Sequence, residues 1–111
     1  MNYKILGKDL KVSAVGLGCM GMSHAYGSPA DKNEMCELIA MAVDLGFNFF
    51  DTAEIYGTVN NPHDNEELVG RALKPYRNKV IIATKFGIEF DKTSNVTNPP
   101  LIPNSRPEVI R

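Results

Sequence analysis

Three short apolar runs, at residues 14–18, 46–51 and 80–85, alternate along the chain with two segments of helical periodicity. Runs of this length, bounded by glycines and polar residues, are typical of short buried strands. Strands that are joined through helices by right-handed crossovers lie parallel, with the helices outside the sheet. The order strand, helix, strand, helix, strand therefore predicts an α/β fold around a parallel sheet.

Capping signals and apolar spacing predict both helices. Asp31 and Glu34 fit a capping box at the start of the first helix, and Gly46 is suited to stop it. Asp64 and Glu67 repeat the capping-box spacing at the start of the second helix. The apolar faces expected in the core consist of Met35, Leu38, Ile39, Ala42 and Leu45 in the first helix, and Leu68, Val69, Ala72 and Leu73 in the second.

Two further segments flank this alternation. Residues 3–6 and 10–13 read as the strands of a hairpin, with a turn at Gly7-Lys8-Asp9. Residues 88–104 are polar and rich in proline, and they are too many for an ordinary strand-to-helix connection. Long loops of this kind are usually functional or disordered, and at this edge the segment would overhang the site. Residues 105–108 offer a third capping box, and the chain ends about one turn later.

Composition places the chain among globular proteins and excludes some classes of function. Hydrophobic residues make up 43% and charged residues 23%, and the net charge is −1. Lysines and arginines are scattered, so we expect no nucleic-acid surface, and no apolar run is long enough for a membrane span. Cys19 and Cys36 have neither metal-ligand nor disulfide spacing, which we interpret as reduced thiols in the cytoplasm.

Asp51 and Lys85 come at the ends of two neighbouring predicted strands. Because ligands bind beyond the carboxyl ends of parallel strands, both side chains should lie at the edge where a ligand would sit. Tyr56 follows Asp51 by five residues, on a predicted turn. The lone loop histidine, His24, is given no function.

These three residue types together indicate general acid catalysis. A tyrosine is a weak acid at neutral pH, and a nearby ammonium group makes a phenol a better proton donor. That ammonium needs a carboxylate partner in a partly dry pocket, and Asp51 can supply it. Tyr56 could then protonate a carbonyl oxygen while hydride arrives at the carbon. A simpler interpretation remains open, in which Asp51 is a turn former or helix cap, or only the partner of Lys85 in a surface salt bridge.

Several motifs carry a resemblance to a known family. They are Gly46 to Ala53, Tyr56-Gly57, Asn65 to Gly70, Ala83 to Gly87 and the N-terminal stretch from Leu6 to Met22. In order and spacing the chain resembles the aldo-keto reductases over nearly its whole length, and the N-terminal stretch resembles the microbial branch.

The resemblance implies the N-terminal part of a (β/α)₈ TIM barrel with a leading β-hairpin, of which about three βα units are present. It implies NADPH bound at the carboxyl-end rim and an Asp-Tyr-Lys-His tetrad. Tyr56 would be the proton donor, Lys85 would tune it, and Asp51 would pair with Lys85 and lie near the nicotinamide ribose. By the same resemblance, Cys19 and Met20 would contact the cofactor.

The tetrad histidine and the residues that grip the adenosine phosphate belong to later strands of such a barrel, beyond Arg111. A TIM barrel takes about 250 residues. We therefore expect residues 1–111 to be the N-terminal portion of a single reductase domain, interrupted early in its third helix and inactive alone. The whole protein is expected to reduce aldehydes or ketones. Two alternatives remain, a non-catalytic reductase-like binding or regulatory subunit and a small flavodoxin-type binding module.

Overall fold

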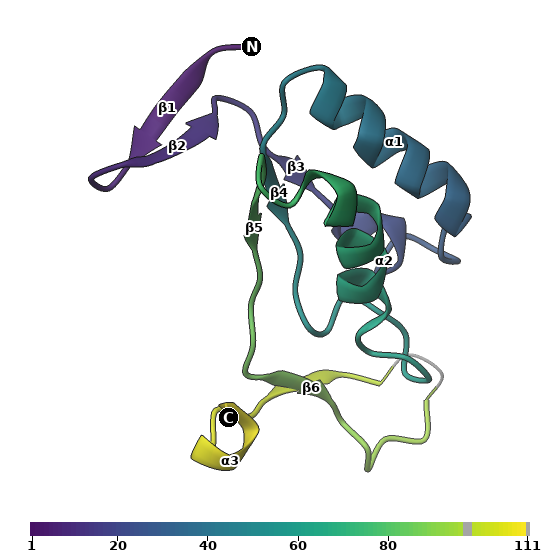
Figure 1. The fold of residues 1–111 in the computed structure, drawn as a ribbon. Coiled ribbons are helices and arrows are strands. Elements are labelled where there is room, and N and C mark those ends of the chain that lie inside the picture. The colour runs from purple at the N-terminus through teal and green to yellow at the C-terminus, as the bar shows by residue number, and fades with distance from the viewer. Residues whose placement is uncertain (97–98, 111) are drawn as a thin grey trace.

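A three-stranded parallel sheet lies at the centre of this computed structural model, which describes residues 1–96 and 99–110 (Figure 1). Its strands are β3 (Leu17–Gly18), β4 (Phe49–Asp51) and β5 (Ile81–Ala83), in the order β3-β4-β5. Phe50 of β4 pairs with Leu17 on one side and Ile82 on the other. The predicted α/β order and parallel sheet are confirmed, although each strand is shorter than its apolar run.

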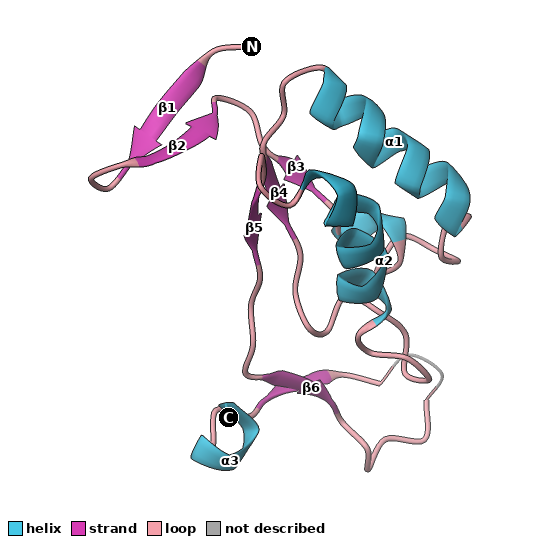
Figure 2. Cartoon of the chain, in the orientation of Figure 1, coloured by secondary structure: helices cyan, strands magenta, loops and turns pink. Residues whose placement is uncertain are grey.

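Helices α1 (Lys32–Asp44) and α2 (Asp64–Leu73) lie against each other on the same side of this sheet (Figure 2). Three side chains at their junction with the sheet, Ile39, Phe50 and Leu73, have no exposed surface. The core of the chain therefore lies between β4 and the two helices.

The predicted ends of α1 are confirmed. The Asp31 carboxylate accepts hydrogen bonds from the backbone N–H groups of Asn33 and Glu34, at 2.9 and 3.0 Å. Gly46 follows the helix with φ +95°, and the N–H groups of Gly46 and Phe47 return to the carbonyls of Val43 and Ala42. This is a Schellman motif, whose left-handed residue is most easily a glycine.

The predicted core face of α1 is partly wrong. Ile39 and Ala42 are buried, but Leu38 is 40% exposed and Leu45 is 66% exposed. The apolar stripe is wider than the contact that α2 and the sheet make with it, so its flanking residues stay at the surface. In α2, by contrast, all four predicted core residues are buried.

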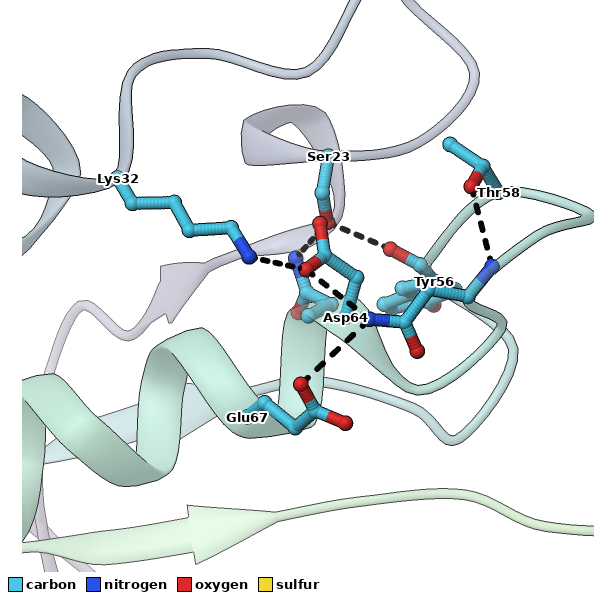
Figure 3. A network of polar contacts seen from close by, with 8 residues as sticks. Ser23, Lys32, Tyr56, Thr58, Asp64 and Glu67 are labelled. Atoms are coloured by element: carbon cyan, nitrogen blue, oxygen red, sulfur yellow. Dashed lines mark hydrogen bonds and ion pairs between the residues drawn. The ribbon is translucent and has the colours of Figure 1, made fainter.

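The predicted capping box of α2 is also wrong. Asp64 lies inside the helix, and the N-cap is His63, whose side chain makes no capping hydrogen bond. The Asp64 carboxylate instead accepts a hydrogen bond from Lys32 Nζ, at 2.6 Å, and so joins the first turns of α1 and α2 (Figure 3). An interhelical ion pair has replaced the local cap that the spacing predicted.

Strands β1 (Tyr3–Leu6) and β2 (Leu10–Ser13) form the expected antiparallel hairpin. The Asn48 side chain ties it to the sheet: its Oδ1 accepts from the Ser13 N–H at 2.6 Å, and its Nδ2 donates to the Lys11 carbonyl at 3.1 Å. The hairpin is thereby held at the start of β4.

Residues 88–104 contain more regular structure than predicted. Strands β6 (Ile88–Phe90) and β7 (Leu101–Pro103) pair antiparallel, and α3 (Pro107–Ile110) follows. Pairing is possible because each end of the segment carries a short apolar run, while the polar and proline residues occupy the connection. Residues 97–98 of this segment and Arg111, at the expected interruption of the helix, lie outside the described residues.

Two short 3₁₀ helices complete the description, η1 (Met20–Met22) after β3 and η2 (Lys74–Tyr76) after α2. In the part of the chain that the structure describes, every helix is too short or too polar to cross a membrane.

Candidate active site

Asp51 and Lys85 meet beyond the carboxyl ends of β4 and β5. The Lys85 ammonium donates to Asp51 Oδ1 at 2.6 Å and to the Thr52 carbonyl at 2.7 Å. Parallel pairing causes this encounter, because Asp51 stands opposite Ala83 in the register and Lys85 follows two residues later. The side chains are 48% and 46% exposed for Lys85 and Asp51, so the ion pair itself adds little stability.

Tyr56 completes the group. Lys85 Nζ lies 4.8 Å from the centroid of the Tyr56 ring. Partial burial lowers the pKa of the Lys85 ammonium, but hydrogen bonding to Asp51 and to Tyr56 more than offsets this, so the pKa lies above its ordinary value. Lys85 is therefore a permanent positive charge beside the phenol at neutral pH. The structure brings together the three predicted catalytic residues, as their places in the sequence suggested.

A histidine that the sequence did not mark also belongs to this site. The His24 ring stacks on the Tyr56 ring, with centroids 5.9 Å apart and planes at 22°. Its Nδ1–H donates to the Gly57 carbonyl at 2.8 Å, and the Phe90 ring of β6 lies nearby, with ring centroids 6.3 Å apart and planes at 56°. A single histidine in a loop carries no periodic signal, so only the folded chain could reveal this contact.

Two hollows adjoin these residues. A small one of about 70 Å³ is lined by Tyr56 and Lys85 together with Phe86 and Ile88. An open cavity of about 740 Å³ lies beyond His24, between the loops around residues 23–28 and 57–60 and the β6–β7 hairpin. Ile88, Phe90 and residues 99–101 of the long segment therefore lie beside the site, as expected.

Cys19 and Met20, the residues expected to contact a cofactor, differ in their surroundings. Cys19 is completely buried, and its backbone N–H donates to the Asp51 carbonyl at 2.9 Å. Burial, together with the negative charge of Asp51, raises the pKa of the Cys19 thiol to about 11. Met20 begins η1 and is partly exposed, so it presents the surface that a ligand at this edge could reach.

A buried polar cluster lies directly behind the site. Asn65 of α2, Thr52 after β4 and Ser23 after η1 are 0%, 2% and 3% exposed. Asn65 Nδ2 donates to Ser23 Oγ at 2.6 Å, and Thr52 Oγ1 donates to Asn65 Oδ1 at 2.6 Å. In the sequence Asn65 stands out only as part of a motif, although an asparagine on the inner face of a helix can indicate a buried polar contact.

Metal binding finds no support in the described part of the chain, where no three histidine, cysteine or acidic side chains come close enough to share an ion.

Comparison with known proteins identifies the family. The sequence profile of the Aldo/keto reductase family matches residues 14–106. The chain belongs to this family. A probable aldo-keto reductase 1 from Glycine max is 45% identical to it over 82 residues, which are 73% of this chain and 22% of that protein.

Solved structures of other aldo-keto reductases share the fold. The holo form of an aldo-keto reductase from Bacillus halodurans is similar with a TM-score of 0.75 and 32% identity, over 99% of this chain and 33% of that one. The glycerol dehydrogenase of Gluconobacter oxydans is similar with a TM-score of 0.72 and 35% identity, over 97% of this chain and 32% of that one. The parallel sheet with its two helices thus belongs to a TIM-barrel-like fold. The chain spans about a third of these two structures and 22% of the curated relative.

Proposed function

We propose that the protein containing this chain reduces an aldehyde or ketone to an alcohol with NADPH. The observation that carries the proposal is the cluster of Asp51, Tyr56 and Lys85 beyond the ends of two parallel strands. Family membership supports it, since aldo-keto reductases are oxidoreductases of carbonyl compounds. A similar structure from Gluconobacter oxydans is named a glycerol dehydrogenase, which fits chemistry between an alcohol and a carbonyl.

The residues at this edge fit one end of a nicotinamide cofactor. Asp51 Oδ1 is taken by Lys85, but Oδ2 has no hydrogen bond within the described residues, and the side chain is 46% exposed. A half-exposed carboxylate oxygen can accept hydrogen bonds from ribose hydroxyls. Met20 and Cys19 are also proposed to contact the cofactor. Met20 is partly exposed, whereas Cys19 is buried next to it and donates its backbone N–H to the Asp51 carbonyl. When bound, NADPH supplies the hydride that reaches the carbonyl carbon.

The chain supplies the proton. Tyr56 donates its phenolic hydrogen to the carbonyl oxygen as negative charge develops there. The Lys85 ammonium, close to the ring, stabilises the phenolate that remains, and Asp51 holds Lys85 charged and in place. The half-exposed position of the pair allows the phenol to regain a proton from water after each turnover.

We further propose that residues 1–111 form the N-terminal portion of a single barrel domain, with about three βα units, and are inactive alone. The lengths of the relatives support this arrangement, since the matched structures are about three times as long. The tetrad histidine would then lie beyond Arg111. A cytoplasmic location is part of the same proposal, and fractionation of the source cells tests it.

The experiment is the substitution Tyr56→Phe in the complete protein. It removes the hydroxyl and keeps the ring that stacks on His24. We expect turnover of a simple aldehyde to fall by roughly 10²–10⁴-fold, the usual contribution of a general acid, with little change in NADPH affinity. Lys85→Met should also be severe, because it removes the charge beside the phenol.

Tyr26→Phe is the matched control, because Tyr26 is 77% exposed on the loop after η1. Steady-state oxidation of NADPH gives the rates, and quenching of cofactor fluorescence gives the affinity. Normal turnover in Tyr56→Phe would refute the assigned role. A wild-type protein that binds NADPH but turns over no carbonyl compound would favour the binding or regulatory subunit instead.

A further inference from the structure

The Asn65 side chain makes three hydrogen bonds inside the fold, two as a donor and one as an acceptor. Its Nδ2 donates to the Cys19 carbonyl at 2.8 Å and to Ser23 Oγ at 2.6 Å, and its Oδ1 accepts from Thr52 Oγ1 at 2.6 Å. The side chain is completely buried. One amide thus connects α2 with the segments that follow β3 and β4.

One branch of this network reaches Tyr56. Ser23 Oγ accepts from Asn65 and donates its own hydrogen to the Tyr56 carbonyl at 2.6 Å (Figure 3). The direction of these bonds is fixed, because an amide nitrogen can only donate and a carbonyl can only accept. The Asn65 amide therefore orients the Ser23 hydroxyl toward the backbone of the proton donor.

The other branch reaches Lys85. Thr52 is held through its hydroxyl by Asn65 and through its N–H by the Ala83 carbonyl at 2.8 Å. The carbonyl of this same residue accepts from Lys85 Nζ at 2.7 Å. Fixing Thr52 therefore fixes one of the two oxygens that hold the ammonium beside the Tyr56 ring.

We propose that Asn65, through Ser23 and Thr52, is a positioning residue that sets the placement of the Tyr56 phenol relative to the Lys85 ammonium. The proposal rests on the proposed function. The network is buried and internally satisfied, since no buried side-chain nitrogen or oxygen in the described residues lacks a partner. The network ends at the Tyr56 carbonyl and at the Thr52 carbonyl that accepts from Lys85. A network that only joined α2 to the sheet would not require either of these two bonds.

Because each bond in the network has a fixed donor and acceptor, a substitution that exchanges a donor for an acceptor tests it directly. Asn65→Asp keeps the size and shape of the side chain and can still accept from Thr52, but it replaces a donor with a carboxylate oxygen. That oxygen faces the Cys19 carbonyl, which it repels, and Ser23 Oγ, whose hydrogen it attracts away from the Tyr56 carbonyl. Ser23→Ala is the milder variant, because it removes the bonds that Ser23 Oγ makes with Asn65 and with Tyr56 but leaves the branch through Thr52 intact. Ser23→Thr retains the hydroxyl and is the conservative variant.

The variants are made in the complete protein, with two matched controls. Asn33→Asp introduces the same change at an exposed site, where Asn33 Oδ1 accepts from Arg71 at 3.0 Å and an aspartate can do so too. Ser105→Ala makes the same change as Ser23→Ala at an exposed serine before α3, outside the network. Two readouts are measured: kcat and KM for an aldehyde, and the NMR resonance of ¹³Cζ-labelled Tyr56, assigned by its loss in Tyr56→Phe.

We expect kcat to fall by roughly 10- to 100-fold in Ser23→Ala and Asn65→Asp, with KM almost unchanged. The upper limit is the roughly 10²-fold cost of a 1 Å displacement. The Tyr56 resonance should shift or broaden in both variants and return toward the wild-type position in Ser23→Thr. Wild-type kcat and an unchanged resonance in Ser23→Ala would overturn the proposal, and this variant decides the question even if Asn65→Asp does not fold. If the wild-type protein has no reductase activity, the proposed function fails, while the resonance still tests the positioning.

Discussion

Gly57, the residue after Tyr56, offers the most direct test of how much the active-site geometry depends on one turn. A Cβ atom at this position would lie 2.6 Å from the Pro62 carbonyl oxygen and 2.7 Å from its carbon, and closer still to the Asn61 carbonyl oxygen. All three are backbone atoms, which cannot rotate away as a side chain can. In Gly57→Ala the two backbone segments must separate by about 0.8 Å or more to reach the 3.4 Å of ordinary contact.

The magnitude of the effect follows from what closes this turn. The Asn61 carbonyl accepts from the N–H groups of Thr58 and Asp64, at 3.1 and 3.2 Å, so separation strains both bonds. Tyr56 is covalently adjacent and should move by a comparable distance. A displacement of about 1 Å costs about 10²-fold in rate, or about 2.7 kcal/mol of barrier. Overpacking of this kind should also lower the free energy of unfolding by about 1–3 kcal/mol.

The assay is kcat/KM for NADPH-dependent aldehyde reduction by the complete protein, together with urea-induced unfolding. Gly70→Ala is the control: a Cβ there meets nothing within 4 Å, inside α2. It should leave the rate unchanged and raise stability by about 0.5–1 kcal/mol, since glycine is unfavourable within a helix. Wild-type kcat/KM in Gly57→Ala would show that the turn adapts without moving the phenol, and the reasoning would be wrong.

Two further predictions concern chemistry and stability away from the phenol. Because burial raises the pKa of Cys19 to about 11, iodoacetamide at pH 8 should modify the partly exposed Cys36 and spare Cys19. Peptide mass spectrometry measures the labelling, and fast labelling of Cys19 in the native protein would contradict this prediction. The folded-state pKa of Cys19 exceeds its ordinary value of 9.0, so its contribution to stability should decline as the pH rises from 9.0 toward 11. Gly46→Ala places a side chain at φ +95° and a Cβ 2.9 Å from Met1 Cβ, so it should lower the free energy of unfolding by about 1–2 kcal/mol. Gly18→Ala is the control, because a Cβ there meets nothing within 4 Å, and it should cause no such loss. Equal stability of the two variants in urea unfolding would contradict this prediction.

Much of the local structure was predictable because it depends on neighbouring residues. The β1–β2 hairpin, the Asp31 cap and the Gly46 stop of α1 each involve interactions over a few residues. The meeting of Asp51 and Lys85 spans 34 residues, yet it was predictable too, because parallel strands bring their carboxyl ends to one edge.

Other features could not be predicted because they depend on which partner a side chain meets. Asp64 has the spacing of a helix cap, but its carboxylate pairs with the Lys32 ammonium of α1 instead of capping α2. Leu45 has the periodicity of a core residue, but no element covers it, and it is 66% exposed. The pairing of β6 with β7 required two short runs, ten residues apart, to find each other across a polar connection.

The sequence by itself determined the order of the hairpin, the three parallel strands and the two long helices, the ends of α1, and the edge at which a phenol, an ammonium and a carboxylate lie together. Periodicity, capping and the parallel crossover rule are properties of the chain, so they can be read along it. The tertiary structure alone decided how that edge is held. His24 against Tyr56, and Asn65 between Ser23 and Thr52, join residues 13 to 42 positions apart. These contacts arise only when the loops after β3 and β4 meet each other and the start of α2, and no local pattern predicts that meeting.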